Sequence, residues 1–227
     1  MNLKNDGYGA YSIWEHSQTV TDLYRKRAAD RVEEMTCAAQ AADLLKPVIH
    51  QGESLLDVGC GSGHFFHSLR KKNIPVDYYG IDASEKFIRI GQQELKAFAL
   101  SPERLKVLRL EDLNATMDHV VCLNVLSNLD NYPRYLERIL LTAQKTVLIR
   151  ESLKEQGEYK YVRDNYLDKG VDLKVHVNAY PVEEVKEFIR AYGFSVTEIV
   201  DKRTGGQEEN VIDYPHYWKF LMATKLN

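Results

Sequence analysis

The sequence has little cysteine: its 227 residues include three, Cys37, Cys60 and Cys122, and their positions do not repeat the short spacings of metal ligands. This pattern predicts reduced cysteines in a cytoplasmic protein and no metal site. Long apolar runs are also missing. No segment approaches the roughly 18 apolar residues of a membrane helix, and residues 1–11 lack the apolar centre of a signal peptide, so we expect no membrane association.

Positive charge is not in excess either. The 30 lysines and arginines are outnumbered by 33 aspartates and glutamates, which gives a formal net charge of −3. Because a polyanion is held mainly by surplus positive charge, this balance argues against a nucleic-acid partner. We therefore expect a partner of another kind.

The length suits one α/β domain that spans residues 1–227 and buries most of its apolar surface. Apolar β-type runs alternate with helix-type segments, which predicts a Rossmann-like, doubly wound and mostly parallel sheet with helices on both faces. The expected strands are 54–58, 77–81, 105–110, 118–123, 145–150, 195–200 and 217–223. The expected helices between them are 62–72, 84–98 and 132–143, followed by an amphipathic helix from Pro181 to Gly193.

Two segments lie outside this alternation. Residues 17–46 lack glycine and proline, so we expect residues 1–46 to form a helical N-terminal cap. Residues 151–180 are charged and contain several tyrosines, and they interrupt the rhythm after the fifth strand. We interpret 151–180 as an inserted segment on the substrate side of the sheet.

The most informative stretch is 55–63, Leu-Leu-Asp-Val-Gly-Cys-Gly-Ser-Gly. Glycines at a strand-to-helix turn allow positive φ and let a ligand approach the main chain closely. A dinucleotide fingerprint would need G-x-G-x-x-G, whereas His64 stands where its last glycine would fall. Asp57 would repel a pyrophosphate and attract an ammonium or a sulfonium group. These features disfavour the alternative of a nicotinamide oxidoreductase. Binding of a nicotinamide cofactor without SAM would establish that alternative.

This stretch resembles the first motif of the class I S-adenosylmethionine (SAM) dependent methyltransferases. The resemblance implies a seven-stranded sheet with an antiparallel last strand, and SAM as cofactor. It also implies that acidic or polar residues at successive strand ends bind the cofactor. Carried over position by position, it assigns this role to Asp57, Gly59, Cys60, Gly61, Gly63, Asp82, Ala83, Asp112, Leu113 and Asn124, with Tyr24 from the cap.

By the same resemblance, Asp57 and the glycines hold the methionine part and Asp82 holds the ribose. Asp112 and Leu113 read the adenine, and Asn124 lines the floor of the pocket. An alternative stays open for each acid. A lone carboxylate after a strand is often a turn residue or a helix cap, and Asp82 followed by Ser84 fits that interpretation too.

Candidates for the acceptor pocket are expected in 151–180, in 201–216 and in the cap. His176 could take a proton from a hydroxyl, and Arg163, Tyr166, Asn178 and Trp14 could contact the substrate. Each of these also has an ordinary interpretation. His176 could lie on the surface of an alternating strand, Arg163 could be solvated, and the aromatic rings could simply pack.

The sequence and the resemblance together predict a SAM-dependent methyltransferase that acts on a small-molecule acceptor by direct displacement. One alternative keeps this chemistry with a protein or RNA as acceptor. Another is a non-catalytic module that binds SAM. The amphipathic N-terminal segment could also support a homodimer.

Overall fold

The computed structural model describes residues 8–211 and 213–226. The N-terminal part is helical, as expected, although the first seven residues of the cap lie outside the described ranges. It consists of α1 (Tyr8–Tyr11), the 3-10 helix η1 (Ile13–Glu15), α2 (Gln18–Ala28) and α3 (Thr36–Leu45). Ser17 caps α2 by accepting a hydrogen bond from the Val20 N–H through its side chain.

The remaining helices follow strands and join them to the next strand. They are α4 (Phe65–Lys71), α5 (Glu85–Glu94), α6 (Pro133–Thr142) and α7 (Val182–Ala191). Short 3-10 turns η2 (Leu95–Phe98), η3 (Pro102–Arg104), η4 (Leu110–Asp112) and η5 (Leu126–Asn128) complete the connections.

The central sheet has the order β3-β2-β1-β4-β5-β12-β9. Its strands are β1 (Ser54–Val58), β2 (Asp77–Asp82), β3 (Leu105–Val107), β4 (Met117–Leu123), β5 (Ala143–Lys154), β9 (Phe194–Val200) and β12 (Trp218–Lys225). All neighbours pair in parallel except β12, which is antiparallel to both β5 and β9. The expected seven-stranded, mostly parallel sheet with an antiparallel last strand is confirmed, and a two-residue strand β8 (Tyr180–Pro181) adds an eighth member beside β5.

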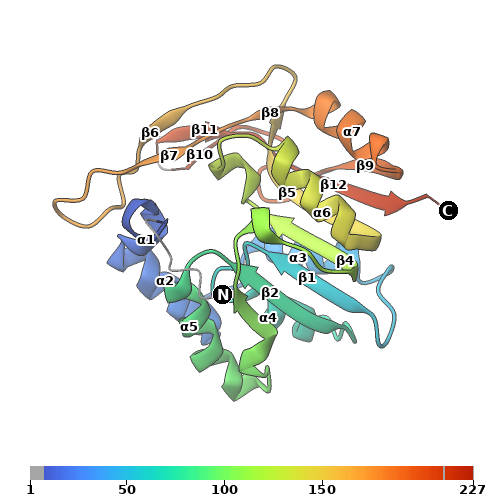
Figure 1. Ribbon diagram of the computed structural model, residues 1–227, viewed down its shortest axis with the longest axis horizontal. Helices are drawn as coiled ribbons and strands as arrows, with labels where there is room; N and C mark the ends of the chain where they lie inside the picture. Colours follow the sequence, from blue (N-terminus) through green and yellow to red (C-terminus); the bar gives the residue numbers. More distant parts are fainter. Residues whose placement is uncertain (1–7, 212, 227) are drawn as a thin grey trace.

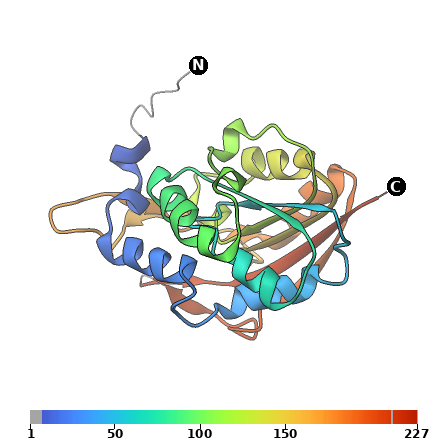
Figure 2. The same ribbon diagram turned by 90° about the horizontal axis from the view of Figure 1, so that it is seen from below.

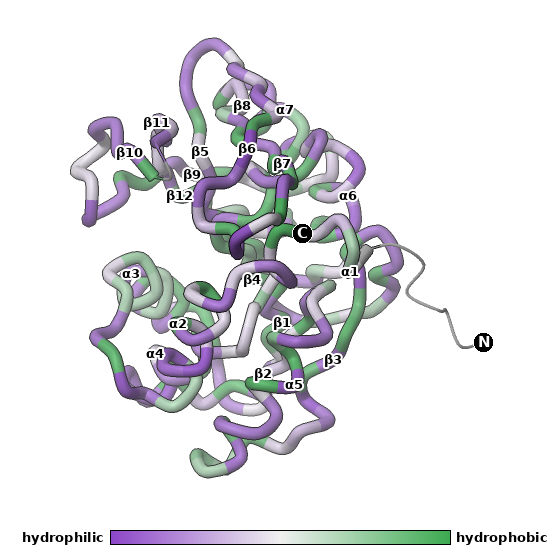
Figure 3. Tube along the Cα trace, turned by 90° about the vertical axis from the view of Figure 1, so that its left-hand side faces the viewer, coloured by the Kyte–Doolittle hydropathy of each residue, from purple (hydrophilic) through white to green (hydrophobic). Residues whose placement is uncertain are grey.

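Helices cover both faces of this sheet, which confirms the doubly wound class (Figure 2). On one face, apolar side chains of α3, α4 and α5 pack against β1 and β4, with Leu45, Leu69 and Ile88 fully buried. On the other face, α6 and α7 pack against β4 and β5 through residues such as Leu136 and Ile189. Hydrophilic residues predominate in the loops at the periphery of the chain trace (Figure 3).

Several expected bounds were wrong at the ends of elements. The strand expected over 105–110 ends at Val107, because residues 110–112 turn into η4 on the way to β4. The helix expected from 62 begins at Phe65, since Gly63 has φ +71° and cannot continue a right-handed turn. The helix expected over 84–98 keeps α-helical bonding only to Glu94 and tightens into η2.

The inserted segment contains a hairpin of β6 (Tyr161–Arg163) and β7 (Lys174–His176), and a second hairpin pairs β10 (Glu209–Val211) with β11 (Tyr214–His216). The β6–β7 hairpin reaches the N-terminal helices (Figure 1). Its Val175 packs with Ile13 of η1 in a small separate core. Ser17 Oγ donates to the Tyr166 carbonyl at 2.6 Å, and the Asp168 N–H donates to the His16 carbonyl at 2.9 Å.

A search of the described residues for a helix long and apolar enough to cross a membrane finds none.

The edge of the sheet opposite the glycine motif carries a charge cluster around Glu53. Its carboxylate accepts hydrogen bonds from Lys145 Nζ at 2.6 Å, from the His50 N–H at 2.6 Å and from His119 Nε2 at 2.9 Å. Burial raises the pKa of Glu53, but these bonds outweigh it and lower the pKa to about 2. The ionised carboxylate therefore favours the folded state.

We predict that the Glu53→Gln variant unfolds more easily than the wild type at pH 7 but loses less stability in acid. A depressed carboxyl pKa gives stability that is complete above the unfolded pKa of about 4.3 and is lost as the pH falls towards 2. Urea unfolding at pH 7, 4 and 3 measures this, with Glu187→Gln on the exposed side of α7 as the control. Parallel pH profiles of the wild type and Glu53→Gln would contradict it.

Candidate cofactor site

The turn after β1 is built from glycines in left-handed conformations. Gly59 has φ +67° and Gly61 has φ +55°. A Cβ at Gly59 would overlap the side chain of Val125, and a Cβ at Gly61 would overlap the ring of Tyr24. Conformation and space therefore both require glycine at these two positions. Val125, in the segment after β4, and Tyr24, on α2, therefore pack directly against the main chain of the turn at these two positions.

Asp57 lies in β1 just before this turn and is 4% exposed. The hydroxyl of Tyr78, on β2, donates a hydrogen bond to its Oδ2 at 2.7 Å. Burial raises the pKa of Asp57 to about 7; the Tyr78 bond opposes this rise and the charge of Asp82 adds to it. A carboxyl in this state gains from a nearby positive charge, because the charge would restore full ionisation.

Asp82 ends β2 and binds two main-chain amides. The Gly61 N–H donates to its Oδ2 and the Ser84 N–H donates to its Oδ1, both at 2.8 Å. Burial raises the pKa of Asp82 to about 6 against the effect of these two bonds. The residue is thus a turn-stabilising acid. Since each carboxylate oxygen has a second lone pair, it keeps the capacity to accept two further bonds.

The N-terminal cap lies on this constellation. The Tyr24 ring stacks on Phe87 of α5 with centroids 4.3 Å apart, and Ser62 Oγ of the glycine turn donates to the Tyr24 carbonyl at 2.9 Å. Glu15 of η1 accepts a hydrogen bond from Ser84 Oγ at 2.5 Å. Glu15 was not identified from the sequence, because an acid in a short 3-10 turn looks like any other surface acid in the sequence.

The segment after β4 is held by a buried acid that sequence reasoning also missed. Glu151, on β5 and 1% exposed, accepts hydrogen bonds from the N–H groups of Val125, Leu126 and Ser127 at 2.9 Å and from Ser127 Oγ at 2.8 Å. Its neighbour Arg150 donates through Nε to Asp201 at 2.6 Å and through Nη1 to Asn124 Oδ1 at 2.5 Å. The signal that could have identified both was a pair of adjacent charges directly after the apolar run Val147 to Ile149.

The residues expected at the adenine lie further along the same edge. Asp112 is exposed at the end of η4, whereas Leu113 is buried in the core and its N–H donates to the Leu110 carbonyl at 3.2 Å. Ala83 is half-buried between Asp82 and Ser84. The Cys60 thiol points into the core against Gly80, so at this position only the main chain belongs to the turn.

The acceptor candidates are not brought together. Asn178 is 1% exposed, and its amide bonds the Lys160 N–H, the Leu129 carbonyl and the Tyr180 hydroxyl. Arg163 pairs with Asp172 on the exposed hairpin, and Tyr166 is 53% exposed. His176 packs against Tyr161 with centroids 4.6 Å apart and an interplanar angle of 33°. Trp14 is half-buried and packs both against the core beneath the cap and against the small core of the hairpin.

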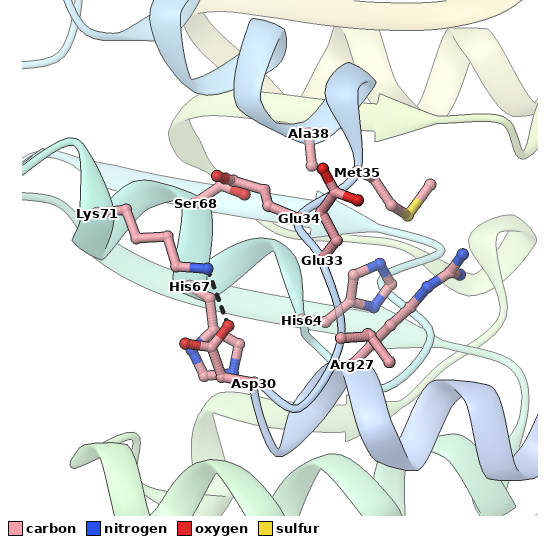
Figure 4. A pocket seen from close by; sticks show the side chains of 11 residues that line it. Arg27, Asp30, Glu33, Glu34, Met35, Ala38, His64, His67, Ser68 and Lys71 are labelled. Carbon is pink, nitrogen blue, oxygen red and sulfur yellow. Dashed lines mark hydrogen bonds and ion pairs between the residues drawn. The ribbon is translucent and has the colours of Figure 1, made fainter.

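A cavity of about 20 Å³ lies beside the glycine turn, between the α2–α3 connection and α4 (Figure 4). Its lining includes His64, which directly follows Gly63, and its rim carries the ion pair between Lys71 and Asp30 at 2.9 Å. Burial lowers the pKa of His64 to about 3, so the ring is neutral. The space suffices for about one water molecule. Within residues 8–211 and 213–226, no cluster of three or more potential metal ligands occurs.

Comparison with known proteins matches part of the sequence to a family. The model of the family described as "Methyltransferase domain" matches residues 56–145, which run from the core of β1 into β5. Residues 56–145 are similar to this methyltransferase-domain family, and the fold of the chain is that of class I SAM-dependent methyltransferases. SAM is the cofactor of this family.

Two solved structures have the same fold at low identity. One is magnesium protoporphyrin IX methyltransferase from Synechocystis PCC 6803 with bound S-adenosylhomocysteine (SAH), at 16% identity, a TM-score of 0.60 and 98% coverage of both chains. The other is a SAM-dependent methyltransferase from Clostridium acetobutylicum ATCC 824, at 13% identity and a TM-score of 0.61, with 90% of this chain and 96% of that one covered.

A curated relative, the carboxy-S-adenosyl-L-methionine synthase of Nautilia profundicola, is 26% identical over 162 residues. The match covers 71% of this chain and 63% of the length of the relative.

We predict that Glu151→Gln lowers the free energy of unfolding by about 3 kcal/mol, because each carboxylate oxygen serves two donors. In either orientation, the amide of glutamine turns an NH₂ group towards two of them. Urea unfolding monitored by circular dichroism measures the loss. In the control Glu158→Gln, which removes a partly exposed partner of Lys154 and Lys160, a change below about 1 kcal/mol is expected. Equal effects of the two substitutions would contradict the role given to Glu151.

Proposed function

We propose that this protein transfers a methyl group from SAM to a small-molecule acceptor. The observation that carries the proposal is a pair of acids, the buried Asp57 and the half-buried Asp82, on either side of a turn that only glycine can form. A pyrophosphate at this turn would meet two carboxyls, whereas the ammonium and sulfonium groups of SAM would be attracted to them.

The residues present fit SAM. Gly59 and Gly61 let Val125 and Tyr24 approach the main chain of the turn closely, and Asp57 lies two residues before Gly59 with a pKa that a cation would lower. We assign Asp57 and the glycines, with the main chain of Cys60, to the methionine part. We assign Asp82 and Ala83 to the ribose, Asp112 and Leu113 to the adenine, and Asn124 and Tyr24 to the two sides of the methionine end.

SAM supplies an electrophilic methyl group on a sulfonium, and direct displacement needs an acceptor atom held in line with it. The chain then has two tasks: to orient the acceptor and to exclude water. Both tasks suit the contact between η1 and the β6–β7 hairpin. There, Ile13 and Trp14 pack against the hairpin near the carboxyl ends of the parallel strands. Displacement from a sulfonium needs a base only for acceptors that must lose a proton first.

The position of this cover favours a small acceptor. The cap is tied to the hairpin by Ser17 and Asp168 and to α5 by Glu15 and Lys86, so it lies across the strand ends rather than leaving them open to a large partner. The net charge of −3 agrees with this, since an RNA acceptor would call for basic surface. If a screen of small molecules yields no acceptor, a protein acceptor is the alternative.

The relative from Nautilia profundicola motivates a second candidate, because its name describes the synthesis of a modified SAM. In that case SAM would be the molecule that is altered rather than the methyl donor. Mass spectrometry of turnover mixtures separates the two: methyl transfer leaves SAH, and carboxylation leaves a product heavier than SAM.

We predict that SAM binds about tenfold more weakly at pH 5.5 than at pH 7.5. The acids are partly protonated below their raised pKa values of about 7 and about 6, and a cationic ligand binds the ionised form, so binding releases protons and tightens as the pH rises. Calorimetric titration with SAM, SAH and NAD in buffers of different ionisation enthalpy measures affinity and proton release.

Asp57→Asn is expected to flatten the upper part of this pH profile, and the exposed Asp172→Asn leaves it unchanged. Binding of NAD without SAM or SAH would overturn the proposed function. Binding of SAM without any pH dependence would overturn the role of the two acids.

A further inference from the structure

Arg150 is a buried arginine whose hydrogen-bonding capacity is only partly used. It lies on β5 opposite Leu123 and is 2% exposed. Its Nε donates to Asp201 and its Nη1 to Asn124 Oδ1, while the guanidinium carbon lies 4.4 Å from the ring centroid of Trp218. Its Nη2 is buried and has no hydrogen-bond partner among the described residues. Because a buried donor without a partner is costly, the Nη2 edge is suited to a ligand atom.

A second buried polar atom lies on the same stack. The His216 ring is stacked on Trp218 with centroids 4.5 Å apart and an interplanar angle of 4°. His216 is 5% exposed, and its Nδ1 also lacks a partner among the described residues. Burial, followed by the charges of Arg150 and Lys160, lowers the pKa of His216 to about 4. The imidazole is thus neutral and can donate a hydrogen bond from one ring nitrogen.

The nearby acids are engaged elsewhere. Asp201 binds Arg150 through Oδ2 and the Thr204 N–H through Oδ1. Glu209 accepts the Trp218 indole N–H at 3.0 Å and pairs with Arg203. Each of these two acids therefore already accepts hydrogen bonds. Neither of them is a partner for Arg150 Nη2 or His216 Nδ1.

The position of Arg150 places its Nη2 edge between the proposed cofactor site and the proposed acceptor site. On one side, Asn124 precedes Val125, whose side chain packs against Gly59 of the glycine turn. On the other side, the stack leads through Trp218 and His216 to β11, at the end of the loop 201–216. A group held there would belong either to the methionine end of the cofactor or to the acceptor beside it.

We propose that the Nη2 edge of Arg150, with His216 on the same Trp218 stack, binds a carboxylate carried by one of the two reactants, which is either the methionine carboxylate of SAM or a carboxylate of the acceptor. The planar guanidinium suits this chemistry, since it can hold Asp201 through Nε and a second carboxylate through a different nitrogen. This assignment rests on the proposed function, because it takes SAM and an acceptor as the ligands of this edge of the sheet.

The first arm of the test compares SAH with 5′-methylthioadenosine, which lacks the amino-acid part. Arg150→Lys keeps the positive charge and removes the forked donor set. If the cofactor supplies the carboxylate, calorimetry shows SAH binding weakened about tenfold or more, with 5′-methylthioadenosine affinity within about twofold of wild type.

The second arm uses protein saturated with SAH and follows the thermal midpoint with benzoate and with succinate. If the acceptor supplies the carboxylate, one of these probes raises the midpoint of the wild type, and the rise is lost in Arg150→Lys while both nucleoside affinities are unchanged. His216→Phe, which keeps a flat ring on Trp218, is expected to reduce the same effect.

A matched control is available at the opposite edge of the sheet. Arg104 also lies over an aromatic ring, 4.3 Å from the Tyr79 centroid, pairs with Asp77 at 3.6 Å and has a buried Nη1 without a partner among the described residues. Arg104→Lys should leave both arms as in wild type. The double variant Arg150→Gln/Asp201→Asn removes both buried charges together and serves if Arg150→Lys does not fold.

The outcomes separate this inference from the proposed function. A wild-type protein that binds neither SAH nor 5′-methylthioadenosine overturns the proposed function and the inference with it. A wild-type protein that binds SAH, with Arg150→Lys or the double variant unchanged in both arms, overturns the carboxylate site alone. Equal losses in Arg150→Lys and Arg104→Lys would also overturn it, since that result would reflect general destabilisation.

Discussion

The hydrogen bond from the Gly61 N–H to Asp82 Oδ2, at 2.8 Å, joins the end of β2 to the middle of the glycine turn, and the geometry of the site depends on it. The parallel pairing of β1 with β2 brings Asp57 opposite Gly80 and Val58 opposite Ile81, so the turn and Asp82 emerge at the same edge. The other Asp82 oxygen accepts the Ser84 N–H, and Ser84 caps α5. One carboxylate thus sets the path of the turn and the start of the next helix.

This arrangement explains why the buried Asp57 and the half-buried Asp82 are suited to a charged ligand. Burial raises the pKa values of Asp57 and Asp82, but each keeps hydrogen-bond donors that favour the ionised form. The segment after β4 is held in a similar way by Glu151. Charged side chains that extend from the sheet therefore fix both the glycine turn and the segment that faces it, which makes the edge stiff before a ligand arrives.

Much of this was predictable from the sequence because the decisive features are local. Strand, acid and glycines follow one another directly in 55–63, and their covalent order fixes their order in space. The end of the third strand was less predictable. The residues Leu108 to Leu110 continue the alternation of the strand in the sequence and therefore predict a longer strand. In the structure the chain turns there and packs Leu110 and Leu113 into the core.

The contacts across the sheet could not be derived from the sequence. Nothing in the local order of residues predicts that Asn178 satisfies the main chain around Leu129, or that Arg150 meets Asp201 across 51 positions. From the sequence, His176 was selected as a candidate near the substrate and His216 was not, yet the fold places His176 on an outer hairpin and His216 on the buried Trp218 stack. Long-range packing decided these cases.

A crystal structure of the protein with SAH tests the central claim most directly. The account predicts the ribose hydroxyls on Asp82, the homocysteine part beside the main chain of Gly59 and Gly61, and its ammonium on the side of Asp57. SAH bound elsewhere, or with its adenine at the glycine turn and no contact to either acid, would contradict it.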